Sequence, residues 1–94
     1  MERNFYVLAY DISNDRRRQK IARLCQAVSE RVQGSVFEGY FTPAELDKLL
    51  KKLERIFDKN EDSLRIYLLC AGCRAKVTTR GRGRLTPPPS VVIL

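Results

Sequence analysis

The order of apolar and polar positions predicts a strand followed by a helix at the start of the chain. Residues 4–10 are apolar almost throughout, which is typical of a central strand buried on both faces of a sheet. Ser13 or Asn14 then provides an N-cap, and a helix is expected from about Asp15 to Ser29. Apolar residues recur along it at helical spacing and form its buried stripe: Ile21, Leu24, Cys25 and Val28.

The middle of the chain predicts short strands and a second helix. Residues 31–41 are β-like but contain two glycines, so they form either two short strands or one bent strand. Thr42, Pro43 and Glu45 are typical of a helix start, because the threonine caps, the proline suits the first turn and the glutamate closes a capping box. Leucines at helical spacing continue this helix to about residue 58.

A last long strand is expected at residues 63–70, where side chains alternate between two faces. One face carries Leu64, Ile66 and Leu68, and the other carries Arg65, Tyr67 and Leu69. Residues 76–79 are predicted to form a short edge strand.

These elements predict an α+β fold with the ferredoxin-like order βαββαβ, in which two helices cover one face of an antiparallel sheet. We expect residues 1–80 to form this domain and residues 81–94 to form a Gly/Arg/Pro-rich tail. The apolar end of the tail, residues 90–94, is predicted to be a dimerisation strand that adds to the sheet of a partner subunit. A frayed tail is the alternative.

The chain is strongly basic, and the excess charge is confined to its last third. Among 94 residues there are 18 Lys and Arg against 11 Asp and Glu. Residues 1–62 are nearly balanced, whereas residues 63–94 contain basic residues and no acidic one. This asymmetry indicates an anionic partner, with nucleic acid ahead of an anionic membrane, because no basic amphipathic helix or long apolar span is present.

The N-terminus and the cysteines indicate where the protein works. Because the chain opens directly into a strand without a signal-peptide pattern, we expect a cytoplasmic protein. Cys25, Cys70 and Cys73 are too few for a disulfide framework and fit a reducing compartment. Cys70 and Cys73 have metal-ligand or redox spacing, but the chain has no histidine to complete a zinc site. A strand-end turn with incidental thiols is favoured over four-cysteine ligation across a dimer.

One carboxylate, Asp11, ends the first buried strand just before a turn. A basic cluster follows it on the first turns of the helix: Arg16, Arg17, Arg18 and Lys20. Cations at a helix start oppose the helix dipole, which hints at a functional use. A carboxylate can hold a metal ion while nearby cations hold a polyanion, as phosphodiester chemistry requires. The alternative is that Asp11 only ends a strand and begins a turn.

Several segments together resemble one protein family, the small CRISPR-associated spacer-acquisition endonucleases (the Cas-two family). The resemblance covers roughly residues 4–80, and it is carried by five features: Tyr10-Asp11-Ile12-Ser13, the arginine-rich helix start that follows, the segment Arg31 to Gly39, Thr42-Pro43-Ala44-Glu45-Leu46, and the segment Asp62 to Tyr67. Each feature alone is weak, whereas the combination is specific.

The resemblance implies a homodimer in which the two Asp11 residues face each other across the two-fold axis and share one Mg²⁺. It also implies metal-dependent endonuclease activity on single-stranded RNA or double-stranded DNA, and a part in integrating new spacers together with an integrase partner. Asp11 is then the metal ligand and catalytic residue, and Tyr10 supports it. Phe37 matches a family position and is expected in core or dimer packing.

The basic residues are expected to bind the phosphate backbone of RNA or DNA. Arg18 and Lys20 match basic positions of the family's first helix, and Arg31 matches its second motif. Lysine at position 20 keeps the charge but loses bidentate phosphate binding. Arg16 and Arg17 are predicted to add supplementary phosphate contacts, with a solvated helix face as the alternative.

The absence of histidine excludes histidine-based acid–base chemistry, so any cleavage would depend on the metal. Glu38 is the nearest candidate for an accessory acid or base. Two other functions stay open: a non-catalytic DNA-binding dimer that acts as a scaffold for the integrase partner, and a ferredoxin-like ribonuclease toxin. An RNA-recognition module is disfavoured, because residues 64–69 lack its aromatic signature.

Overall fold

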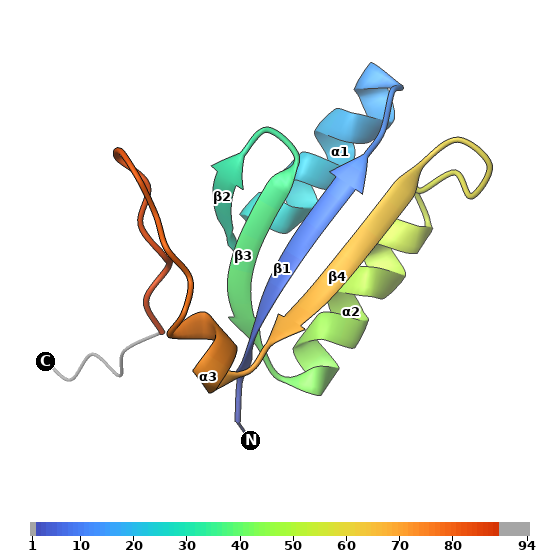
Figure 1. Cartoon of the computed structure of the whole chain (residues 1–94). Helices are drawn as coiled ribbons and strands as arrows, with labels where there is room; N and C mark the ends of the chain where they lie inside the picture. Colours follow the sequence, from blue (N-terminus) through green and yellow to red (C-terminus); the bar gives the residue numbers. More distant parts are fainter. Residues whose placement is uncertain (1, 89–94) are drawn as a thin grey trace, which may run out of the picture.

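The structure, a computed structural model, describes residues 2–88 and consists of a four-stranded antiparallel sheet with two long helices on one face (Figure 1). Its elements are β1 (Asn4–Asp11), α1 (Asp15–Gln26), β2 (Glu30–Gln33), β3 (Val36–Phe41), α2 (Pro43–Glu54), β4 (Ser63–Leu69) and the short α3 (Ala71–Arg74). The strand order is β2-β3-β1-β4. The predicted βαββαβ order and the ferredoxin-like arrangement are therefore confirmed.

Both helix starts form where their capping residues predict. The Asn14 side chain accepts a hydrogen bond of 2.9 Å from the Arg17 amide, which makes Asn14 the N-cap of α1. Thr42 and Glu45 form the expected capping box at the start of α2.

The end of α1 was predicted too late. The helix ends at Gln26, and the Ser29 hydroxyl donates back to the Cys25 carbonyl at 2.5 Å. Such side-chain bonds compete with further helical bonds, and β2 begins one residue later. Val28 consequently lies outside the helix and is 52% exposed, so its placement in the buried stripe was wrong. The second helix also ends before residue 58, at Glu54.

The register of the central strand β1 divides its side chains between two faces. Leu8 pairs with Phe37 on β3 and with Ile66 on β4, and this face packs against the helices. The core on this side contains Leu8, Tyr10, Ile12, Ile21, Ala22, Cys25, Phe37, Phe41, Leu49 and Leu53. The alternation predicted for residues 63–70 is confirmed for Leu64 and Ile66, which pack against this core, whereas Leu68 on the same face is 58% exposed.

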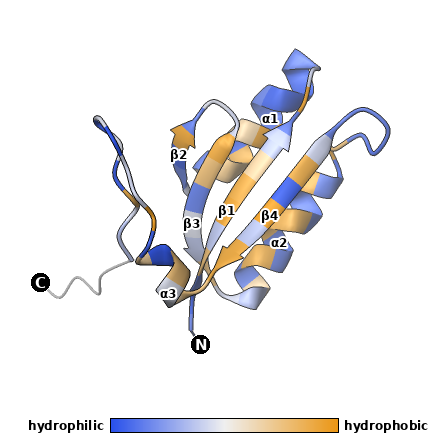
Figure 2. Ribbon diagram, in the orientation of Figure 1, coloured by the Kyte–Doolittle hydropathy of each residue, from blue (hydrophilic) through white to orange (hydrophobic). Residues whose placement is uncertain are grey.

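The opposite face of the sheet, called the open face below, carries neither α1 nor α2; only the short α3 approaches it, at one end (Figures 1 and 2). Phe5, Val7, Ala9 and Asp11 belong to it on β1, since they alternate with the helix-side residues. The C-terminal segment reaches its edge at β3, where the Tyr40 hydroxyl donates to the Thr86 carbonyl at 3.2 Å. A partly covered, mainly apolar surface therefore lies opposite the helices.

Three expectations for the rest of the chain have different outcomes. Residues 31–41 form two short strands, β2 and β3, with an irregular register between Arg31 and Gln33. Residues 76–79 do not form the predicted edge strand; a helical turn, α3, ends the sheet before them and turns the chain away from β4. The predicted dimerisation strand at residues 90–94 lies outside the described residues.

Within residues 2–88, no helix has the length and apolar character needed to cross a membrane.

Candidate metal and nucleic-acid site

Asp11 is the last residue of β1, and it is exposed at the rim of the open face. Its register partner is Ser63, the first residue of β4. Among residues 2–88 its carboxylate takes part in no hydrogen bond or ion pair. The end of a strand thus exposes to solvent a carboxylate that has no hydrogen-bond or ion-pair partner among residues 2–88.

The fit to a magnesium ion depends on a second copy of the chain. Mg²⁺ requires six oxygen ligands, of which proteins usually supply one or two carboxylates. Within the described chain, no group of three or more potential ligand residues is close enough together to hold a metal. One chain offers Asp11 alone, whereas two copies related by a two-fold axis would offer two carboxylates.

Tyr10 points away from the face that carries Asp11. Its ring lies in the helix-side core, is 5% exposed and stacks on Phe37 with a centroid distance of 6.1 Å. The hydroxyl has no hydrogen-bond partner in the described part of the chain. Burial raises the pKa of Tyr10, and the positive charges of Arg31 and Arg18 partly oppose this. Tyr10 therefore does not share the surface of Asp11, and its supporting role stays a prediction.

Phe37 is fully buried in the same core, so the expectation of a packing residue is confirmed for the core. The Arg31 guanidinium lies over its ring at 5.5 Å and donates to the Gly34 carbonyl at 3.0 and 2.8 Å. Arg31 is thereby held on the helix side of β2.

A basic hollow of about 230 Å³ lies between α1 and β2. Its lining consists of Arg18, Gln19, Ala22, Arg23, Gln26 and Arg31. Arg18 is fixed at its rim, because its guanidinium donates to the Ile12 carbonyl at 3.1 Å and pairs with Asp15. Since Ile12 directly follows Asp11, Arg18 connects the end of β1 with this hollow.

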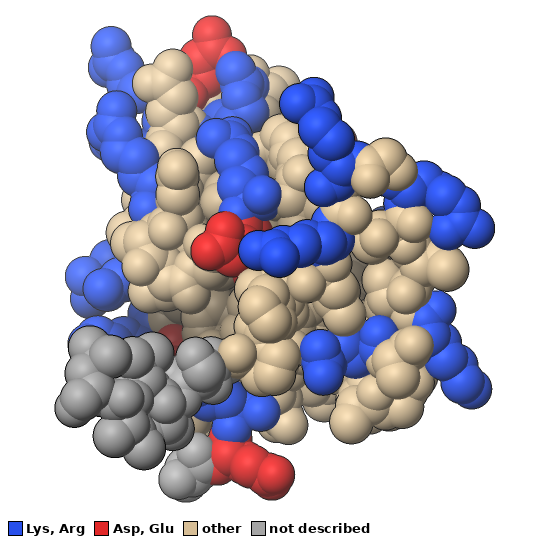
Figure 3. All heavy atoms as spheres, turned by 90° about the vertical axis from the view of Figure 1, so that its left-hand side faces the viewer, with Lys and Arg blue, Asp and Glu red and all other residues tan. Residues whose placement is uncertain are grey.

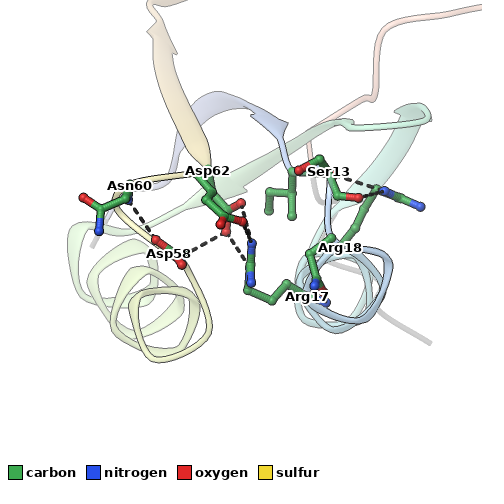
Figure 4. Close-up of polar contacts among 9 residues, drawn as sticks. Ser13, Arg17, Arg18, Asp58, Asn60 and Asp62 are labelled. Atoms are coloured by element: carbon green, nitrogen blue, oxygen red, sulfur yellow. Dashed lines mark hydrogen bonds and ion pairs between the residues drawn. The ribbon is translucent and has the colours of Figure 1, made fainter.

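Arg17 is committed to an internal ion pair (Figure 4). Its Nε donates to the Asp62 carboxylate at 2.9 Å, and its second nitrogen reaches Glu61 at 2.9 Å. The Asp62 side chain is completely buried and also accepts from the Asp58 amide at 2.9 Å. Hydrogen bonds from Arg17 lower the pKa of Asp62. The structure thus gives Arg17 a clamping role between α1 and the loop before β4, in place of a free phosphate contact.

Sequence reasoning missed this clamp because its two ends are 45 positions apart and no local pattern pairs them. The one available signal was an acid, Asp62, placed directly before an apolar strand, where a buried charge needs a partner.

Arg16 and Lys20 are exposed, and neither forms an ion pair within residues 2–88. The C-terminal third adds further exposed cations: Lys76, Arg80, Arg82 and Arg84. Figure 3 shows the side of the molecule that faces left in Figure 1, where Lys and Arg side chains far outnumber acidic ones. These cations can contact a polyanion without breaking an ion pair within residues 2–88, and of the six only Arg80 donates a side-chain hydrogen bond there, to the Thr79 carbonyl at 3.0 Å.

Glu38 is buried on β3 at 8% exposure, and one carboxylate oxygen accepts from the Thr86 amide at 2.5 Å. Its register partner on β1 is Val7, four residues before Asp11. At about 3.3 Å per residue, this places Glu38 roughly 13 Å along the strand from Asp11. Within one chain, Glu38 is therefore too distant to serve as the accessory acid or base that the sequence suggested.

Comparison with known proteins gives a family match over most of the described chain. The model of the family "CRISPR associated protein Cas2" matches residues 4–77. A CRISPR-associated endoribonuclease Cas2 of Synechocystis is 44% identical over 89 residues, which cover 95% of this chain and 97% of that protein.

Two solved structures share the fold. Streptococcus pyogenes Cas2 superimposes with a TM-score of 0.73 at 35% identity, and the match covers 82% of this chain and 99% of that one. A chain of a partial Cas6-RT-Cas1–Cas2 complex gives a TM-score of 0.72 at 30% identity, covering 81% of this chain and 89% of that one. The sequence resemblance is thus confirmed independently at the level of sequence and fold.

Proposed function

The chain belongs to the CRISPR-associated protein Cas2 family, and we propose that it is a Mg²⁺-dependent endonuclease that takes part in integrating new spacers. Related proteins of the family are named endoribonucleases, and one structural relative is part of a complex that includes Cas1. The observation that carries the proposal is the exposed, uncommitted Asp11 at the end of a rigid strand, close to a basic helix start.

The active species in this proposal is a homodimer formed through the open face. Val7, Ala9 and Tyr40 are only half-buried there, and Tyr67 is 47% exposed. A second copy would cover this apolar surface and bring a second Asp11 to the same rim, which completes a two-carboxylate metal site. An integrase partner related to Cas1 would bind this dimer.

Each residue then has a separate task. The two Asp11 carboxylates hold the ion, and Mg²⁺ when bound supplies positive charge that stabilises the phosphate during hydrolysis. Arg16, Lys20 and the cations of the C-terminal third hold the backbone of RNA or DNA. Arg18 fixes the turn after Asp11 through its bond to the Ile12 carbonyl, which keeps the carboxylate in place.

The proposal is tested by incubating the purified protein with single-stranded RNA and double-stranded DNA in Mg²⁺ and in EDTA, with its mass in solution measured in parallel. We expect cleavage of at least one substrate in Mg²⁺, none in EDTA, and a dimer. Cleavage that is equal in EDTA, or cleavage by a monomer, contradicts the proposed site.

Backbone binding predicts a strong dependence of affinity on salt. If about six phosphates are neutralised, the affinity for nucleic acid falls about 1,000-fold between roughly 50 and 200 mM salt. Titrations with a fluorescent oligonucleotide measure this slope. Arg16→Ala should reduce it, whereas Lys51→Ala should not, because Lys51 already pairs with Asp47 at 3.1 Å on α2. Salt-independent binding contradicts the assignment.

A second candidate function is a DNA-binding scaffold without catalysis. The exposed cations of the C-terminal third favour it, because their binding to a nucleic-acid backbone requires no metal. Spacer integration that survives the loss of cleavage would support this function. The family match over residues 4–77 favours these two functions over the third class, a ribonuclease toxin.

A further inference from the structure

Two cysteines lie together where the sheet ends, and the function proposed above uses neither of them. Cys70 follows β4 and is the N-cap of α3, and Cys73 is one helical turn later. Both are free and exposed, whereas Cys25 is completely buried in the core. The chain thus presents one accessible pair of thiols and one inaccessible thiol.

The first turn of α3 brings the Cys70 thiol against the backbone of Cys73. The Cys73 amide donates to the Cys70 Sγ at 3.4 Å, so the Cys70 side chain folds back over the first turn of α3. The neighbouring Cys70 side chain raises the pKa of Cys73. The backbone amide of Cys73 lowers the pKa of Cys70. The two sulfurs are therefore neighbours of unequal acidity.

The residues between the cysteines leave the sulfurs open. A Cβ at Gly72 would meet only the Cys70 Sγ, at 3.9 Å, so glycine keeps that side of the sulfur uncovered. Residues 63–88 contain no acidic side chain, while Arg74 and Lys76 lie close by in the chain. An anionic thiolate at Cys70 meets no like charge from its own segment.

We propose that Cys70 and Cys73 form a thiol–disulfide exchange site for low-molecular-weight disulfides such as oxidised glutathione. The Cys70 thiolate attacks one sulfur of the disulfide, forms a mixed disulfide and releases one thiolate. Cys73 loses its proton to solvent, attacks the Cys70 sulfur and displaces the second thiolate. Both cysteines are oxidised to one intramolecular disulfide, and the reagent is reduced to two thiols.

The two cysteines lie where the C-terminal segment begins, directly after β4. Arg74, directly after Cys73, places its guanidinium 5.7 Å from the centre of the Tyr40 ring on the open face. Further along, Thr86 bonds to Glu38 and to Tyr40. A disulfide across the first turn of α3 would therefore restrain the start of the segment that follows α3, which carries the exposed cations of the C-terminal third. This inference does not depend on nuclease activity.

The test uses the full-length protein equilibrated with mixtures of reduced and oxidised glutathione, quenched in acid, unfolded and alkylated for mass spectrometry. We expect Cys70 and Cys73 to become resistant to alkylation together, while Cys25 remains alkylatable and the chain stays free of intermolecular links. Protection of neither residue, or crosslinked chains as the main product, overturns the proposal.

Serine variants identify the role of each sulfur. Serine is a good N-cap, so Cys70→Ser preserves the start of α3. In Cys73→Ser we expect the reaction to stop at a stable glutathione adduct on Cys70. In Cys70→Ser we expect Cys73 to react with iodoacetamide about tenfold more slowly than Cys70 does in Cys73→Ser at neutral pH. Equal rates overturn the assignment of Cys70 as the attacking thiol.

Discussion

Asp11→Asn is expected to lower Mg²⁺-dependent cleavage by about 100-fold or more. The substitution keeps the size of the side chain but removes the negative charge that a hard cation requires. Asp11 has no hydrogen bond or ion pair within residues 2–88, so the fold should be unaffected, and the midpoint of thermal unfolding should stay unchanged. Rates at several Mg²⁺ concentrations measure the effect.

The matched control is Asp47→Asn, which removes the same charge from an exposed position on α2. It should cleave like the unmodified protein. Equal cleavage by Asp11→Asn and Asp47→Asn would remove Asp11 from the chemistry. Spacer integration should be measured separately with the integrase partner: lost cleavage with retained integration would show that hydrolysis is dispensable for adaptation.

Asp62→Asn is expected to lower the midpoint of thermal unfolding by about 10 °C. The Asp62 carboxylate is fully buried, and it receives both Arg17 and the Asp58 amide. A neutral amide there weakens the charge-assisted bonds and leaves Arg17 without a buried counter-charge. Differential scanning calorimetry measures the shift. The control is Glu61→Gln, since Glu61 is the exposed second partner of Arg17, and we expect a shift of no more than about 2 °C.

This clamp also predicts how stability changes with pH. Hydrogen bonds from Arg17 lower the pKa of Asp62 in the folded state, below its value of about 3.9 in the unfolded chain. The contribution of Asp62 is therefore present above about pH 4 and is lost as pH falls through the folded pKa. The difference in stability between the unmodified protein and Asp62→Asn should shrink below pH 4. A difference that stays constant from pH 7 to pH 3 would contradict the ion pair.

The helix starts and the strand faces were predicted correctly from the sequence, because both depend on local chemistry. Asn14 and Thr42 bond to amides only a few residues away, so the sequence alone specifies these caps. The alternation along β4 is equally local, because side chains of a strand alternate with a period of two.

The misplaced elements depend on contacts that local patterns do not contain. Val28 fits the helical period of α1, yet Ser29 bonds to the Cys25 carbonyl and the chain leaves the helix to join the sheet. Residues 76–79 have β-forming character, but after α3 no described strand edge pairs with them. Tertiary pairing decides whether such segments become strands.

By itself, the sequence determined the order of elements, the basic C-terminal third and the position of Asp11 at the end of a strand. It grouped Tyr10, Asp11 and three consecutive arginines as one site. Only the tertiary structure separated Tyr10 and Arg17 from Asp11. The alternation of β1 sends Tyr10 into the core and Asp11 to the open face, and the buried Asp62 binds Arg17 across the fold. Local rules cannot predict that division, because a buried charge selects its partner by proximity in space.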